Sequence, residues 1–171
     1  MGFVRIKKIK GNKYAYLVES NWTKKGPRQK TKKYLGKVYS PRREKDLTFF
    51  EYFDDYKIDF RNQKELIQDT IKLELVNYGF TQKESGVWER DGYFIDVKNL
   101  KFFNSKGKNV AIELNDGALC KPLIDKIVKL KIDPLKEDYE KEGYGLAKLL
   151  VESGLKVDSQ IFIKIYDLAR A

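Results

Sequence analysis

The sequence has no histidine and a single cysteine, Cys120, in 171 residues. Without histidine, the chain lacks the usual acid–base group of enzymes, the Ser-His and Cys-His nucleophile pairs, and the common zinc ligand sets. A single cysteine excludes an internal disulfide, and its place on an apolar stripe at helical spacing predicts core packing. We therefore expect no cofactor, no metal and a cytoplasmic location.

Long apolar runs are missing as well. No stretch reaches the roughly 18 apolar residues of a membrane span, and the first residues lack the hydrophobic region of a signal peptide. A glycine-rich phosphate loop is also absent. The sequence therefore predicts a protein without a membrane partner.

Acidic residues are scarce only at one end of the chain. Residues 1–45 hold 15 Lys and Arg against two acidic residues, Glu19 and Glu44, a net charge of +13. The other 126 residues hold 20 basic and 23 acidic groups, a net charge of −3. Charges that serve solubility are normally mixed in sign, so this end predicts contact with a polyanion.

The basic end has the pattern of a small sheet. Residues 3–10 and 13–20 are rich in aromatic and β-branched residues, and the Gly11-Asn12 pair between them suits a type II′ hairpin turn. Residues 28–38 predict a third strand after a turn-rich stretch. The result is a basic three-stranded antiparallel sheet.

Side chains alternate between the two faces of a strand, which separates two sets of residues. In the expected register Lys7 lies opposite Tyr16, while Ile6 and Leu17 share the other, aliphatic face. The first set is expected to gather Arg5, Lys7, Tyr14 and Tyr16 with Arg28, Lys30, Lys32 and Tyr34 of the third strand, and we call it the tyrosine face. Lysines that merely solvate an open sheet are the alternative interpretation. The candidate nucleic-acid-binding residues are Arg5, Lys7, Lys8, Lys10, Lys13, Tyr14, Tyr16, Arg28, Lys30, Lys32, Lys33 and Tyr34.

A resemblance is carried by two runs, VRIKKIKGNKYAYLVES and GPRQKTKKYLGKV. They resemble the N-terminal segment of a class of acidic-triad transposases, in which a lysine-bearing hairpin, a Y-x-Y pair and a later R-Q-K…Y-L-G precede the catalytic core. In weaker outline they are similar to the arm-site DNA-binding domain of tyrosine recombinases. The resemblance covers residues 1–39 and implies DNA contact through these cations and tyrosines. Because no transposase core or recombinase nucleophile follows, it implies a shared binding module on another body.

Thr48 and Glu51 form a capping box before an aromatic stripe, which predicts a helix. The stripe is expected to clamp the sheet to the rest of the chain, with a protein partner as the alternative. The expected organisation is a basic sheet over residues 1–45, an aromatic bridging helix over residues 46–61 and a body over residues 62–171.

In the body, segments whose apolar residues recur with the period of a helix alternate with segments that have the period of a strand. Asn62 and Glu65 repeat the capping pattern and predict a helix that ends near Gly79. Residues 80–115 predict an antiparallel meander. Three helices are expected after it, over residues 119–128, 136–153 and 159–169. The fold class is therefore expected to be α+β.

One set of residues resembles the order of elements in PD-(D/E)xK nucleases: Glu65, Glu89, Asp96 and Lys98. In those enzymes carboxylates hold a divalent metal, and a lysine helps to position the attacking water. In the expected hairpin register Glu89, Asp96 and Lys98 share one face. However, Glu89 stands where an aspartate after proline is expected, and Asp96 follows it too closely. A solvated strand face is the favoured interpretation, with no catalytic residues.

These patterns predict a non-enzymatic nucleic-acid-binding protein that contacts duplex DNA through the basic sheet. Tyrosines on an open sheet serve RNA or single-stranded bases equally well, so an RNA-binding or ribosome-associated protein is the first alternative. A metal-dependent nuclease is the second. The third is a protein-interaction module that binds through the body or the aromatic helix.

Overall fold

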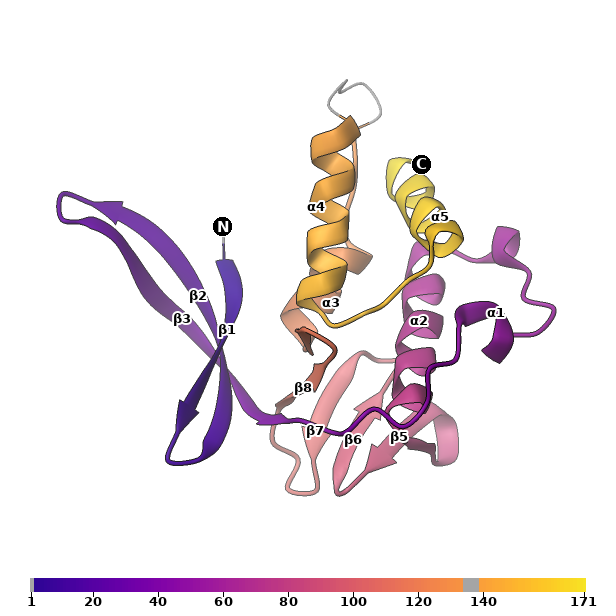
Figure 1. Ribbon diagram of the computed structural model, residues 1–171, viewed down its shortest axis with the longest axis horizontal. Helices are drawn as coiled ribbons and strands as arrows, with labels where there is room; N and C mark the ends of the chain where they lie inside the picture. The colour runs from indigo at the N-terminus through magenta and orange to yellow at the C-terminus, as the bar shows by residue number, and fades with distance from the viewer. Residues whose placement is uncertain (1, 134–138) are drawn as a thin grey trace.

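A computed structural model describes residues 2–133 and 139–171 and has the expected α+β architecture (Figure 1). Strands and helices fall into two sheets and a helical layer, with the N-terminal strands standing to one side of the helices. The first sheet, in spatial order, consists of β1 (Gly2–Ile9), β2 (Asn12–Thr23), β3 (Gly26–Tyr39), β8 (Val110–Leu114) and β9 (Gly117–Leu119). The second consists of β4 (Thr81–Gln82), β5 (Val87–Arg90), β6 (Tyr93–Asp96) and β7 (Lys101–Asn104).

Five α-helices and two 3₁₀ turns complete the described chain. They are α1 (Phe49–Tyr52), α2 (Gln63–Asn77), α3 (Lys121–Val128), α4 (Tyr139–Glu152), α5 (Ser159–Arg170), η1 (Ile58–Phe60) and η2 (Glu84–Gly86). Residues 136–138, where we expected the fourth helix to begin, lie outside the described residues. Among the described residues, no helix combines the length and apolar character that a membrane span requires.

Helix α2 begins and ends where its capping pattern predicts. The side chain of Asn62 accepts a hydrogen bond from the Glu65 amide at 2.9 Å, and Glu65 returns one to the Asn62 amide at 3.0 Å. Gly79 follows the helix with a φ of +67°. Cys120 caps α3 and is buried, and burial raises the pKa of its thiol to about 11. The capping bonds confirm the expected start of α2, and the burial of Cys120 confirms its expected packing in the core.

The prediction of one bridging helix over residues 46–61 is wrong. Helix α1 has a single turn, because Phe53 leaves the helical region with φ −106° and ψ 74° and Asp55 has a φ of +54°. The aromatic rings instead pack on one another: Phe49 lies 4.8 Å from both Phe53 and Tyr56 between ring centroids. Aromatic residues at this spacing can therefore belong to a long helix or to an irregular segment in which the rings pack on one another. The spacing alone does not distinguish these two structures.

The predicted meander is also wrong in one respect: β8 does not belong to it. The second sheet is an antiparallel meander that includes the expected Asp91-Gly92 turn, whereas β8 pairs in parallel with β3, with Lys37 opposite Val110. The backbone of β3 passes close to β8 at Gly36, which has a φ of +126°. Alternation identifies a strand but not its partner, so the sequence could not show that the basic sheet continues into the body.

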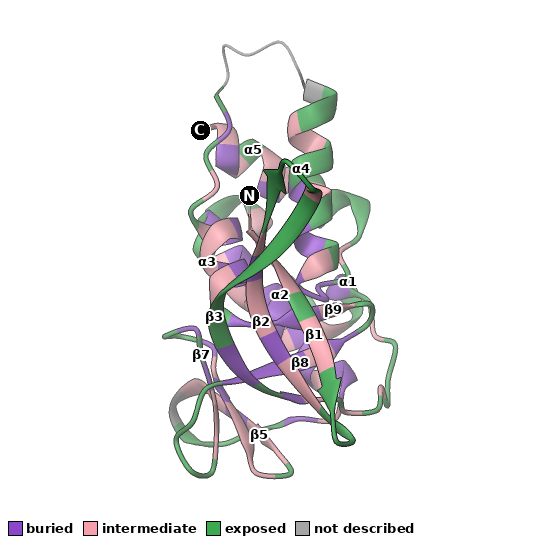
Figure 2. Cartoon of the chain, turned by 90° about the vertical axis from the view of Figure 1, so that its left-hand side faces the viewer, coloured by how far each residue is buried: buried purple, intermediate pink, exposed green. Residues whose placement is uncertain are grey.

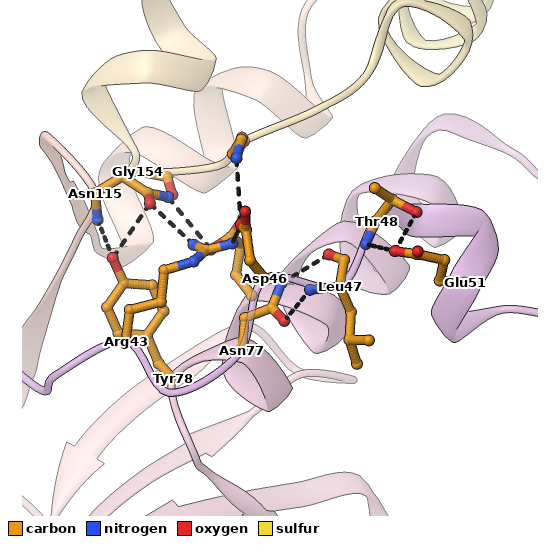
Figure 3. Close-up of polar contacts among 11 residues, drawn as sticks. Arg43, Asp46, Leu47, Thr48, Glu51, Asn77, Tyr78, Asn115 and Gly154 are labelled. Atoms are coloured by element: carbon orange, nitrogen blue, oxygen red, sulfur yellow. Dashed lines mark hydrogen bonds and ion pairs between the residues drawn. The ribbon is translucent and has the colours of Figure 1, made fainter.

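The segment between β3 and α1 is fixed to the body by a partly buried polar cluster (Figure 3). Arg43 donates hydrogen bonds to Glu74 of α2 and to Asn115, each at 3.0 Å. Burial raises the pKa of the Glu74 carboxyl, although Arg43 opposes the shift. Asn77 pairs with the backbone of Leu47 through two hydrogen bonds of 2.9 and 3.0 Å. These contacts hold the segment that follows β3 against α2 and against the turn after β8.

Candidate nucleic-acid interface

The first hairpin has a different turn from the one expected. Lys10 and Gly11 both have positive φ, +47° and +82°, as a type I′ turn requires, so Ile9 pairs with Asn12. The register is shifted by two residues, and Lys7 faces Tyr14 across the strands. Because side chains alternate with a period of two, this shift preserves the expected faces.

The three tyrosines lie together on the tyrosine face, as predicted. The ring of Tyr34 lies 6.4 Å from that of Tyr14 and 5.4 Å from that of Tyr16 between centroids. The ammonium group of Lys7 lies 5.1 Å from the centroid of the Tyr16 ring. Tyr34 is 53% exposed, and partial burial and its two tyrosine neighbours raise the pKa of its hydroxyl. This row of rings is open to a ligand at its centre.

Strand β3 departs from regular alternation, which moves several cations off the tyrosine face. Its pairing with β2 is irregular at two places and leaves Lys32 without an opposite residue. Lys30 consequently lies opposite Glu19, and Arg28 lies opposite Asn21, on the face of Leu17. The expected placement of these cations beside the tyrosines is therefore wrong. Bulges add one residue locally and leave no reliable mark in the sequence.

The pairing of β1 with β2 stops at Gly2 and Glu19. Beyond this point residues 20–29 of β2 and β3 project as a two-stranded ribbon (Figures 1 and 2). Trp22 near its tip is 84% exposed and lies opposite Pro27. The hydroxyl of Thr23 donates to the carbonyl of Gly26 at 2.8 Å, which closes the tip. Sequence reasoning treated this stretch as a turn and missed Trp22. An indole in a lysine-rich stretch was the available signal.

Most candidate cations lack a carboxylate partner. In the described part of the chain, only Lys13 and Lys32 of that set form ion pairs, with Glu113 at 2.5 Å and Glu19 at 2.9 Å. Arg5 instead donates to the side chain of Gln29. The other candidates, together with three basic residues that sequence reasoning missed, are available to an anion. Those three residues are Lys24, Lys25 and Lys37.

The nuclease-like set is not assembled into one site. The hairpin register confirms that Glu89 and Asp96 share a face, but Glu65 is engaged in capping α2. Glu89 accepts a hydrogen bond from the Gly92 amide and Asp96 accepts one from the Asn99 amide, each at 3.0 Å. Over residues 2–133 and 139–171, no three His, Cys, Asp or Glu side chains are grouped to hold a metal ion.

Comparison of the chain with protein-family models, curated proteins and solved structures found no match. The resemblance of residues 1–39 to transposases and recombinases therefore stays a prediction.

Proposed function

We propose that this protein binds duplex DNA through its N-terminal sheet, with the projecting ribbon in a groove. One observation carries the proposal: residues 20–33 hold six Lys and Arg and no acidic residue, and all but Gly26 are exposed. Neutralising phosphates with such cations releases the counterions of DNA, which is the main source of affinity.

The distribution of the cations favours a groove over a flat contact. Arg28 and Lys30 lie on the face of Leu17, whereas Arg5 and Lys7 lie on the tyrosine face. A sheet that carries cations on both faces suits a groove that has phosphates along both walls. The major groove is about 12 Å wide and admits a two-stranded ribbon. Trp22 would then reach the base edges while the cations fix the register on the backbone.

RNA or single-stranded DNA is the second candidate, favoured by the row of Tyr14, Tyr34 and Tyr16. An exposed ring can stack on an unpaired base for about 1–3 kcal/mol, whatever the base. A paired base offers no such face. The tyrosine row would therefore be unused by a simple duplex.

Competition separates the candidates. A labelled duplex bound to the full chain is displaced by unlabelled duplex, matched RNA or single-stranded DNA at one fixed salt concentration. We expect the duplex to compete best, and log K to fall linearly with log salt by about 0.9 per phosphate contacted. Tighter RNA binding would reverse the order of the candidates. A flat salt response would favour a protein partner and refute phosphate contact.

A matched control uses two exposed lysines on the side of the molecule away from the sheet. Lys57 precedes η1 and Lys64 lies in the first turn of α2. The double variant Lys57→Ala, Lys64→Ala removes two positive charges and should leave the salt dependence unchanged. Replacement of Lys24 and Lys25 in the ribbon turn should lower its slope by about two.

A further inference from the structure

A cleft lies between the tyrosine face and the body. It has a volume of about 720 Å³ and is lined by Tyr14, Tyr34 and Lys37 from the sheet and by Tyr93 and the 104–109 loop from the body. Sites for small ligands typically measure about 300–1,000 Å³. The cleft therefore has the size of a ligand site and joins two parts of the chain far apart in sequence.

The chemistry of its walls suits a nucleotide. The loop contributes Lys106 and Lys108, both exposed and without an ion pair in the described part of the chain, and the sheet contributes Lys37. Asp91 is the acidic residue of the lining, and it accepts a hydrogen bond from the Tyr39 hydroxyl and lies 3.6 Å from Arg90. Lysines bind phosphate, and tyrosine rings stack on bases.

The loop that carries the two lysines is held in place. The side-chain oxygen of Asn104 accepts hydrogen bonds from the amides of Lys106 and Lys108 at 3.0 and 3.1 Å. The Ser105 amide donates to the carbonyl of Gly92 at 2.9 Å. These bonds preorganise the loop, so binding would order little more than the lysine side chains.

A second hollow, on the other side of β3, is a poorer site for an anion. It has a volume of about 670 Å³, and its charged lining consists of Lys33, Lys101 and Lys121 together with the carboxylates Asp96 and Asp125, of which Asp125 is paired with Lys121. Its mixed charge does not select phosphate. The cleft on the tyrosine side is therefore the preferred candidate.

We propose that this cleft binds an unpaired nucleotide next to the duplex held by the ribbon, so that the preferred ligand is a duplex with a single-stranded tail. The proposal rests on the proposed function and deepens it. Trp22 and Tyr14 lie at opposite ends of one face of β2, eight residues or about 26 Å apart. That distance corresponds to about eight base pairs. Tyr16, the ring of the tyrosine row that does not line the cleft, lies between the two sites, where the tail would pass.

The test compares a blunt duplex, the same duplex with a tail, the tail alone and a free nucleoside triphosphate. Binding is measured by fluorescence anisotropy for the full chain and for the double variant Lys106→Ala, Lys108→Ala. We expect this variant to bind the tailed duplex about tenfold more weakly, with a salt slope smaller by about 1.4. Its affinity for the blunt duplex should change less than about twofold. The Lys57→Ala, Lys64→Ala variant should bind all ligands like the wild type, and thermal unfolding checks that both variants are folded.

Each other outcome is decisive. Equal losses on blunt and tailed duplex, or no loss on either, would overturn the nucleotide site while the ribbon variants still test the proposed function. Binding of the free triphosphate alone, lost in the loop variant, would keep the cleft as a nucleotide site and refute the tail. A wild-type protein that binds none of the four ligands would refute both proposals.

Discussion

The two halves of strand β3 have opposite environments. From residues 27 to 34 every residue is exposed, whereas Leu35, Gly36 and Val38 are buried and the strand pairs with β8 (Figure 2). The first half does not pack against the core and is rich in lysine. The second half belongs to the core of the body. One strand thus joins a surface available for binding to the part that stabilises it, and changes in each half should have different effects.

The largest effect is expected from the two glycines of β3 that have positive φ. A Cβ on Gly36 would lie 2.7 Å from the carbonyl carbon of Asn109, whereas one on Gly26 would meet nothing within 4 Å. Gly36→Ala should lower the free energy of unfolding by about 3–5 kcal/mol through overpacking and backbone strain. Gly26→Ala should cost about 1–2 kcal/mol from strain alone. Urea unfolding measures both, and equal losses would contradict the comparison.

The next effect separates the two faces of β2. Leu17 is partly buried against the core, so Leu17→Ala should destabilise the protein by about 1–3 kcal/mol, less than a fully buried leucine. Tyr16→Ala should cost under about 1 kcal/mol and instead weaken binding, because its ring packs against Lys7 and Tyr34 on the open face of the sheet. Unfolding curves and DNA titrations check both. The reverse pattern would mean that the faces are exchanged.

A smaller effect tests whether both faces of the N-terminal sheet are used. Arg28→Ala and Lys30→Ala should each reduce duplex affinity several-fold and lower the salt slope by about one, and Lys7→Ala on the other face should do the same. Binding titrations at several salt concentrations measure both quantities. If only Lys7→Ala weakened binding, the sheet would act as a flat platform and not enter a groove.

The smallest effect concerns the ion pair of Lys13 with Glu113, which joins β2 to β8 across β3. Partial burial alone would raise the pKa of Glu113, but hydrogen bonds from Lys13 and Ser40 and the charge of Lys13 lower it overall. A lowered pKa stabilises the fold above the unfolded-state pKa, and this contribution is lost as pH falls through the folded-state value. Glu113→Gln should therefore reduce the loss of stability between pH 6 and pH 3 by under about 1 kcal/mol. An unchanged pH profile would show that the pair contributes nothing.

Local features of the fold were predictable because their causes are local. The capping box of Asn62 and Glu65 and the Asp91-Gly92 turn act within a few residues, and both occur where expected. The shared face of Tyr14, Tyr16 and Tyr34 follows from alternation, which a two-residue shift does not alter.

The features that the sequence did not predict depend on contacts between distant residues. Nothing near Lys37 shows that Val110 will be its parallel partner. The irregular pairing at Lys32 has no local mark, so the face of Arg28 was assigned wrongly. Lys106 was missed because its loop reaches the tyrosine face only in the folded chain, through a contact between residues far apart in sequence.

The parallel pairing of β3 with β8 also has a consequence for synthesis of the chain. Lys37 and Val110 are 73 positions apart, so the ribosome needs about 4–15 s to make the partner after the strand itself. During that interval the buried half of β3 is an unpaired edge, and such edges promote aggregation. Lys33 and Lys37 flank Leu35 within this segment. Their charge would discourage premature pairing with other nascent chains. The lysines proposed to bind nucleic acid would therefore also protect β3 from aggregation until β8 has been synthesised.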